Sequence, residues 1–231
     1  MKINTLPKDQ TATSAAMALN KLFAEQQGKE FLFLSSGGSS LKILDHIDTN
    51  NFGPQSTIGV LDERYSTDPE INNLAQLEKT QFFKKALANG ANFIDTKPKQ
   101  DESAEELAKR FEDALRKFSG EIIASVGIGP DAHTSGIMPF PEDPELFEKT
   151  FNDTEHWVVA YDAQNKNPYR VRITTTLPFL RKIDHAVIFA IGDEKKPALQ
   201  KLLSENGTLA ESPCRIWREN PSSELFTDQT I

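Results

Sequence analysis

Short apolar runs alternate with longer amphipathic stretches along the chain. The short runs are rich in β-branched and aromatic residues and stop at Gly, Pro or charged positions, which predicts buried strands. They occupy residues 31–34, 57–61, 92–94, 121–128, 157–160, 170–175, 186–191 and 215–217. Apolar residues at helical spacing predict helices over 9–27, 41–47, 73–88, 103–118 and 192–203. This alternation predicts an α/β fold, a single domain over residues 1–231 with three layers and a largely parallel sheet flanked by helices.

Two of these elements carry further detail. Ser103 and Glu106 have the spacing of a capping box at the start of the helix over 103–118. In the strand over 170–175, alternation places Arg172 on the polar face, opposite Ile173. Arg170 shares that polar face, so spacing alone does not say which of the two arginines points to solvent.

Composition and charge narrow the class of protein. A formal net charge of −8 argues against a nucleic-acid-binding protein, which would need a basic face. It does not exclude a small anionic ligand, which needs only a local cluster of Arg and Lys. The longest apolar run, 186–191, is too short to cross a bilayer, and the start of the chain lacks a secretory signal. We therefore expect a cytoplasmic protein with no nucleic-acid or membrane partner, a monomer or a homodimer. Cys214 and Trp217 are expected to pack in the core.

The segment Gly127–Gly136 has the richest chemistry and directly follows a predicted strand. Gly and Pro end the strand, and an Asp-x-His pair, Asp131 and His133, comes next, followed by Thr134. In open α/β sheets, ligands bind at the carboxyl ends of the strands. An Asp-x-His pair there can supply a base and the group that orients it. The alternative is a polar turn whose histidine only hydrogen-bonds the backbone.

Three further predicted strands end in residues of interest. A Gly-rich turn between a strand and a helix presents backbone N–H groups to an anion, although it is often only a tight connection. Three adjacent charges at a strand end are usually a solvated loop. The residues concerned are Gly37, Gly38 and Ser39 after 31–34, Asp62, Glu63 and Arg64 after 57–61, and Lys195 after 186–191.

In order and content these motifs resemble those of the 6-phosphogluconolactonase family, in the group of glucosamine-6-phosphate isomerases and 6-phosphogluconolactonases. The family pattern runs S-G-G-S/T, D-E-R with S-N, G-x-G-x-D-G-H-T, R-x-T-x-T and G-x-x-K. The matching segments here are Ser36–Ser39, Asp62–Arg64 with Asn72–Asn73, Gly127–Thr134, Arg172–Thr176 and Gly192–Lys195. Ordered motifs that span roughly residues 10–217 are far more specific than any one of them. The resemblance implies a sugar-phosphate isomerase-like, modified Rossmann fold and hydrolysis of 6-phosphogluconolactone in the oxidative pentose phosphate pathway.

The resemblance also implies roles for individual residues. His133 is expected to activate water as a general base, because an imidazole with an ordinary pKa of roughly 6.5 suits that task near neutral pH, and Asp131 is expected to hold it. The sugar phosphate is the expected small-molecule partner, and the scheme requires no metal or organic cofactor. Its phosphate is expected to contact Gly37, Gly38, Ser39, Arg64, Arg172 and Lys195, with Asp62, Glu63, Asn73 and Thr134 in support.

Departures from the family pattern leave some questions open. Ala132 replaces the usual Gly of D-G-H, so either its backbone does not need a positive φ or it is mildly strained. The deaminase branch resembles D-E-Y and has a Glu five residues after the motif histidine, where this chain has Arg64 and Met138. Lactone hydrolysis is therefore favoured. The alternatives are an isomerase or deaminase that uses Asp62 or Glu63 as base, and a sugar-phosphate-binding regulator without activity.

Overall fold

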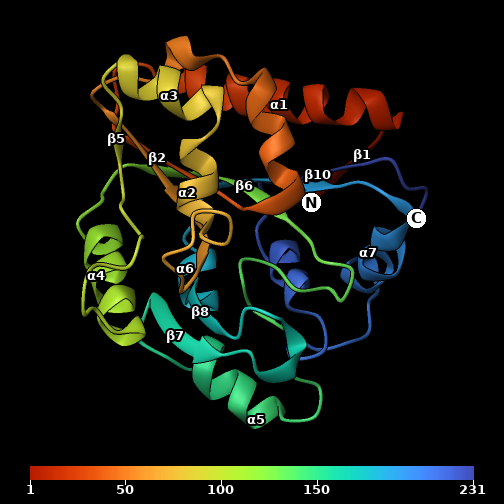
Figure 1. Ribbon diagram of the computed structural model, residues 1–231. Coiled ribbons are helices and arrows are strands. Elements are labelled where there is room, and N and C mark those ends of the chain that lie inside the picture. The colour runs from red at the N-terminus through yellow and green to blue at the C-terminus, as the bar shows by residue number, and fades with distance from the viewer.

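The main sheet consists of seven strands, all parallel, in the order β1-β10-β9-β6-β2-β3-β5 (Figure 1). The structure, a computed structural model, describes all 231 residues. The strands of this sheet are β1 (Lys2–Thr5), β2 (Phe31–Ser35), β3 (Ser56–Val60), β5 (Asn92–Phe93), β6 (Glu121–Gly127), β9 (His185–Ala190) and β10 (Ser223–Thr227). The prediction of an α/β fold with a largely parallel sheet is confirmed.

Helices flank this sheet, and α1 and α3 lie on the opposite side of it from α4 and α5 (Figure 1). The capping box predicted for α4 is present, with the Ser103 hydroxyl accepting the Glu106 backbone N–H and the Glu106 carboxylate accepting that of Ser103. None of the helices combines the length and apolarity needed to cross a bilayer. The α-helices are α1 (Lys8–Glu25), α2 (Asn73–Glu78), α3 (Gln81–Ala88), α4 (Ala104–Arg116), α5 (Pro144–Phe147), α6 (Leu177–Leu180) and α7 (Lys196–Leu203). The other helical turns are η1 (Gly38–His46), η2 (Thr49–Asn51), η3 (Glu148–Asn152), η4 (Gln164–Lys166), η5 (Asp193–Lys195) and η6 (Pro213–Arg218).

The alternation of side chains along β2 divides the interior into two cores. Phe31 and Phe33 pack with α1, α3 and η1, whereas Leu32 and Leu34 pack in the core that contains α4, α6 and α7. All four side chains are buried because both faces of the strand are covered. This double coverage explains why β2 has an uninterrupted apolar run rather than an alternating sequence.

A second, smaller sheet belongs to the core on the α4 side. It is antiparallel, with strand order β4-β8-β7, and consists of β4 (Asp62–Arg64), β7 (Val158–Asp162) and β8 (Val171–Thr175). The solvated-loop interpretation of Asp62–Arg64 is therefore wrong, because the segment pairs with β8 and buries both carboxylates. On β8, Arg172 is buried beside the Asp62 carboxylate, while Ile173 packs in the core on the other face.

Several predicted element boundaries also need correction. Residues 215–217 form part of η6, not a strand, and the last strand is β10, whose Ser-Glu-Leu-Phe-Thr sequence has too few apolar residues to be recognised. The predicted helix over 73–88 is two helices, because the Thr80 hydroxyl caps a new helix by accepting the Phe83 N–H. The strand β1 lies at the sheet edge and is mostly exposed, so its sequence lacks a buried pattern.

The order of the strands leaves a crevice at the carboxyl end of the main sheet. From β2 the chain continues to its neighbour β3 on one side, whereas from β6 it continues to β9 on the other. The loops that leave β2 and β6 therefore diverge, which creates the topological switch point where open α/β sheets bind ligands.

Candidate functional site

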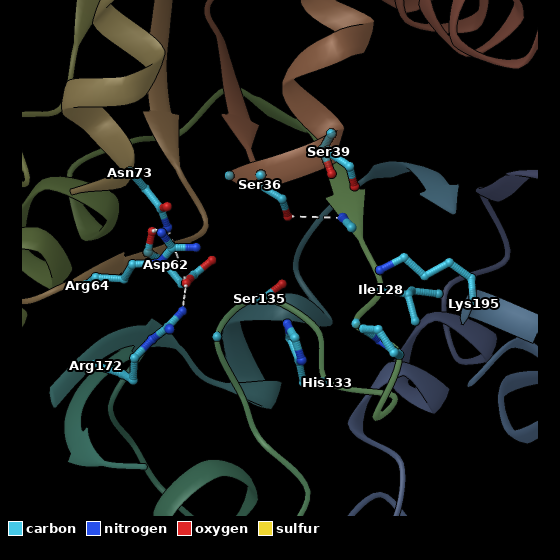
Figure 2. A pocket seen from close by; sticks show the side chains of 17 residues that line it. Ser36, Ser39, Asp62, Arg64, Asn73, Ile128, His133, Ser135, Arg172 and Lys195 are labelled. Atoms are coloured by element: carbon cyan, nitrogen blue, oxygen red, sulfur yellow. Dashed lines mark hydrogen bonds and ion pairs between the residues drawn. The ribbon is translucent and has the colours of Figure 1, made fainter. Parts of the chain in front are cut away.

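A polar cleft lies at this switch point (Figure 2). Of its 17 lining residues only one, Ile128, is hydrophobic, so the cleft suits a polar ligand rather than an apolar one. The lining residues are Ser36, Gly37, Gly38, Ser39, Ser40, Asp62, Arg64, Asn73, Gly127, Ile128, Gly129, Pro130, His133, Ser135, Gly136, Arg172 and Lys195. Most of the residues predicted from sequence are therefore brought together by the fold.

The Asp-x-His pair forms a hydrogen bond at the edge of the cleft. His133 Nδ1 lies 2.5 Å from Asp131 Oδ1, and the His133 backbone N–H donates to the same oxygen at 3.2 Å. Burial tends to raise the pKa of Asp131, but the hydrogen bond and charge of His133 outweigh it, so the pKa is lowered. An ionised Asp131 accepts the proton on Nδ1, which leaves Nε2 of the neutral ring free to take a proton.

The backbone around His133 is adapted to this ring. A Cβ on Gly129 would lie 2.0 Å from His133 Nδ1, so no larger residue fits there without moving the imidazole. Ala132 has φ +74°, in the left-handed region that disfavours residues with a Cβ. Of the two expectations for Ala132, the strained conformation is the one that the structure contains.

Three cations line the same cleft, and Figure 2 shows Arg64 and Arg172 on the opposite side from Lys195. Asp62 is the only acidic residue in the lining, although the whole chain carries a net charge of −8. A cationic cleft in an acidic protein favours an anionic ligand. Arg170 lies outside the cleft, where it is exposed and its Nε donates to Asp162 at 3.0 Å.

The cations are held in different ways. Arg172 Nη2 lies 2.5 Å from Asp62 Oδ2, and both side chains are almost fully buried. Arg64 donates through Nη1 to the Ile71 carbonyl at 3.3 Å, and its guanidinium lies over the Tyr169 ring. Lys195 forms no ion pair, and burial lowers the pKa of its ammonium group. An anion bound in the cleft would provide the ion-pair partner that Lys195 lacks within the protein.

Buried polar atoms without a partner are concentrated in this cleft. Eight buried side-chain atoms in the protein lack a hydrogen-bond partner, and five of them belong to lining residues. Such atoms each cost roughly 1–3 kcal/mol, so their clustering indicates a surface shaped to hydrogen-bond a ligand. The five are Ser40 Oγ, Arg64 Nε, Asn73 Oδ1, Ser135 Oγ and Arg172 Nε.

Two residues predicted as support, Glu63 and Thr134, do not line the cleft. The fully buried Glu63 carboxylate accepts the backbone N–H groups of Arg64 at 2.8 Å, Asn73 at 2.5 Å and Leu74 at 2.9 Å. It therefore fixes the backbone of two lining residues, Arg64 and Asn73. Thr134 is fully buried, and its hydroxyl donates to the Gly127 carbonyl at 3.0 Å.

Two residues that hold the backbone around the cleft, Ser36 and Tyr161, were not predicted from the sequence. Ser36 Oγ accepts the Gly127 N–H at 3.1 Å and so connects the ends of β2 and β6, and its place before the Gly pair could have indicated this. The Tyr161 hydroxyl donates to the Gly136 carbonyl at 2.5 Å, a contact from a distant strand for which the sequence has no signal. No group of three or more His, Cys, Asp or Glu side chains forms a candidate metal site.

The chain is similar to known proteins over nearly its whole length. The family model described as glucosamine-6-phosphate isomerases/6-phosphogluconolactonase matches residues 7–226. A 6-phosphogluconolactonase of Nostoc sp. is 27% identical, with 97% of this chain and 93% of that protein covered. The 6-phosphogluconolactonase of Bos taurus is 28% identical, with 77% of this chain and 70% of that protein covered.

Solved structures show that the fold is shared. The 6-phosphogluconolactonase from Shewanella baltica matches with a TM-score of 0.74 at 21% identity, over 98% of this chain and 95% of that one. The 6-phosphogluconolactonase from Thermotoga maritima matches with a TM-score of 0.73 at 18% identity, over 98% of both chains.

Titration of Glu63 predicts a pH dependence of stability. Burial raises its pKa from 4.5 to about 7, although its backbone hydrogen bonds lower it. At pH values between about 4.5 and 7, Glu63 is protonated in the folded protein but ionised in the unfolded chain. The contribution of Glu63 to stability is therefore lost as the pH rises through this range. The Gln side chain of Glu63→Gln does not titrate. Its deficit in unfolding free energy relative to the wild type should therefore shrink between about pH 5 and 7.5, measured by urea denaturation.

The control for this prediction is Glu70→Gln, which changes an exposed carboxylate in the neighbouring loop. Its stability curve should run parallel to that of the wild type over the same pH range. A constant difference between wild type and Glu63→Gln would show that Glu63 stays ionised throughout.

Proposed function

This chain belongs to the family of glucosamine-6-phosphate isomerases and 6-phosphogluconolactonases, and we propose that it hydrolyses 6-phosphogluconolactone to 6-phosphogluconate, a step of the oxidative pentose phosphate pathway. The observation that carries the proposal is a histidine oriented by a carboxylate, in one cleft with three cations. The curated relatives reported above have the same activity in their names.

In the proposed reaction, His133 is the general base. Nε2 takes a proton from a water molecule, whose oxygen attacks the lactone carbonyl, and Asp131 stabilises the imidazolium that forms. The ester bond to the ring oxygen then breaks, and the imidazolium returns the proton to that oxygen. The products are a carboxylate and a hydroxyl group on an opened chain, together with one released proton.

The cations are proposed to bind the phosphate at the other end of the sugar. Arg64, Arg172 and Lys195 can approach it from different sides. Ser39 lines the cleft in the first turn of η1, where the backbone N–H groups have no helical partner and could bind an anion. The Asp62 carboxylate fixes the direction of the Arg172 guanidinium. Binding energy from this remote group would position the lactone carbonyl beside His133.

The isomerase and deaminase alternative has less support. Met138, at the position where the deaminase branch has a Glu, is fully buried in the core and does not line the cleft. Asp62 already pairs with Arg172 and accepts from Asn73 Nδ2, and Glu63 lies outside the cleft. Neither carboxylate is hydrogen-bonded to His133, which pairs with Asp131 instead.

A direct comparison of substrates tests this function. Between about pH 6 and 8, the purified protein should hydrolyse 6-phosphogluconolactone, followed as 6-phosphogluconate formed above the spontaneous rate, because one histidine and one water suffice. Glucosamine 6-phosphate should release no ammonia. Comparable ammonia release would favour the deaminase and move the proton-transfer role to Asp62. Tight binding of 6-phosphogluconate without turnover would instead favour a regulator.

The role of the base is tested by His133→Ala. Loss of general base catalysis should lower kcat by roughly 10²- to 10⁴-fold, while the Kd for 6-phosphogluconate, measured by calorimetry, changes little. The control is His46→Ala, which removes an exposed imidazole that does not line the cleft. Near-normal turnover in His133→Ala would mean that another group activates the water.

The phosphate site is tested by Lys195→Ala, since Lys195 has no ion-pair partner to leave unpaired. Loss of a charge-assisted contact of roughly 1.5–3 kcal/mol should weaken binding of 6-phosphogluconate by about 10- to 150-fold. Arg172→Ala should weaken it similarly but also lower the melting temperature, because Asp62 is left buried and unpaired. Arg170→Ala is the matched control and should change binding little, since exposed ion pairs contribute little. Equal sensitivity at Arg170 would contradict the assignment.

A further inference from the structure

Both neighbours of His133 in the chain are bonded to one short helical segment near the C-terminus. The Cys214 backbone N–H donates to the Ala132 carbonyl at 3.0 Å. Trp217 Nε1 donates to Thr134 Oγ1 at 2.9 Å. Cys214 and Trp217 belong to η6, which is more than 75 residues away in sequence. One rigid turn therefore holds the chain on either side of the imidazole.

The residues that form these two hydrogen bonds are buried in the interior, although the imidazole of His133 lines the cleft. Ala132, Thr134, Cys214 and Trp217 are all fully buried, whereas the His133 side chain is 31% exposed. A hydrogen bond away from water is electrostatically stronger than an exposed one, and a buried indole N–H without a partner is costly. These residues are thus better protected from water than the imidazole that they hold.

The Thr134 hydroxyl extends the connection from Trp217 to the end of β6. It donates its single hydrogen to the Gly127 carbonyl and accepts from the indole through a lone pair, so both bonds form at once. Short antiparallel bridges pair Thr134 with Ile128 and Ile137. The chain after His133 is therefore tied both to the main sheet and to η6.

The chain before His133 needs external support. Ala132 adopts φ +74°, which a residue with a Cβ leaves readily when it is not held. Its N–H donates to the Gly129 carbonyl, and its own carbonyl accepts from Cys214. The hydrogen bond from Cys214 thus stabilises the strained backbone of Ala132, the residue before His133.

We propose that η6 positions the general base, with Trp217 as the positioning residue that acts through Thr134. The inference rests on the proposed role of His133. The residues proposed to hold the phosphate, Arg64 and Lys195, belong to other elements, and neither is hydrogen-bonded to Trp217. Loss of the indole bond therefore affects the geometry of proton transfer, and hence kcat, more than it affects substrate binding.

Three variants test the bond itself. Trp217→Phe keeps a buried aromatic ring but removes the N–H, and Thr134→Val removes the hydroxyl at nearly constant volume. Each should lower kcat by about tenfold while KM changes by less than about twofold. Both remove the bond between the indole and the hydroxyl, and Thr134→Val also removes the bond to the Gly127 carbonyl. The double variant should therefore be no slower than Thr134→Val alone. Thr134→Ser, which retains the hydroxyl, should recover most of the lost turnover.

The control for loss of an indole is Trp157→Phe, at a partly buried tryptophan that packs against Phe179 and forms no hydrogen bond with residues 129–138. It should change the melting temperature without changing kcat. Hydrogen exchange gives a readout that does not need activity: amides of residues 129–137 should exchange faster in Trp217→Phe than in the wild type or Trp157→Phe.

The outcomes are distinguishable. A Trp217→Phe protein that loses thermal stability but keeps wild-type kcat and wild-type exchange of the loop would show that Trp217 only fills the core. If that variant does not fold, Trp217→His, whose ring retains an N–H, is compared with Trp217→Leu, and the proposal requires the higher kcat and the slower loop exchange in Trp217→His. Equal values of kcat in Thr134→Val and Thr134→Ser also overturn the proposal. Absence of lactonase activity in the wild type would refute the proposed function. Faster exchange of residues 129–137 in Trp217→Phe would still support the inference that η6 holds the loop around His133.

Discussion

The loop from Gly129 to Met138 carries the proposed base, and hydrogen bonds from opposite sides hold it. On one side η6 contacts the residues next to His133, as described above. On the other side Thr174 Oγ1 donates to the Ser135 carbonyl, and the Tyr161 hydroxyl donates to Gly136. Burial raises the pKa of Tyr161, so its hydroxyl remains a donor at neutral pH. Hydrogen bonds from the small sheet and from η6 thus add to the burial of Ala132, Ile137 and Met138 in holding this loop in place.

The charges of the cleft depend on a second buried contact. Asp62 and Arg172 form an ion pair with little access to water, and such a pair recovers its desolvation cost only with good geometry and additional hydrogen bonds. Asp62 obtains these from Asn73, whose amide donates to its carbonyl at 2.9 Å and to its carboxylate at 3.4 Å. The pair therefore specifies the direction of Arg172 more than it adds to stability. That direction matters because Arg172 lines the cleft and its Nε has no hydrogen-bond partner within the protein.

The location of the cleft follows from the topology of the main sheet. β2 and β6 are adjacent and parallel, and their continuations depart in opposite directions. Close approach of the two loop ends requires small residues, because a Cβ on Gly127 would lie 2.7 Å from Ser40 Oγ. A Cβ on Gly37 would likewise lie 2.3 Å from Asn73 Oδ1 in α2. Gly37, which suggests an anion site from sequence, is thus also needed because a side chain at this position would collide with Asn73.

The sequence by itself determined the α/β class, the main helices and the strand ends that carry His133, Arg64 and Lys195. These features depend on local spacing, apolar runs and turn residues, which can be recognised within a short window. The edge strand β1, the strand β10 and the split between α2 and α3 were not recognised, because their local patterns are weak or continuous.

Only the tertiary structure decided which distant residues meet. The antiparallel pairing of β4 with β8 brings Asp62 to Arg172, 110 positions later in the chain. The expectation that Trp217 packs in the core was right about its burial, but its hydrogen bond to Thr134 spans 83 positions. Spacing along a chain encodes the propensity of each segment, whereas the partner of a buried polar group depends on how the segments pack. For that reason the sequence indicated the candidate base, and the fold determined what holds it.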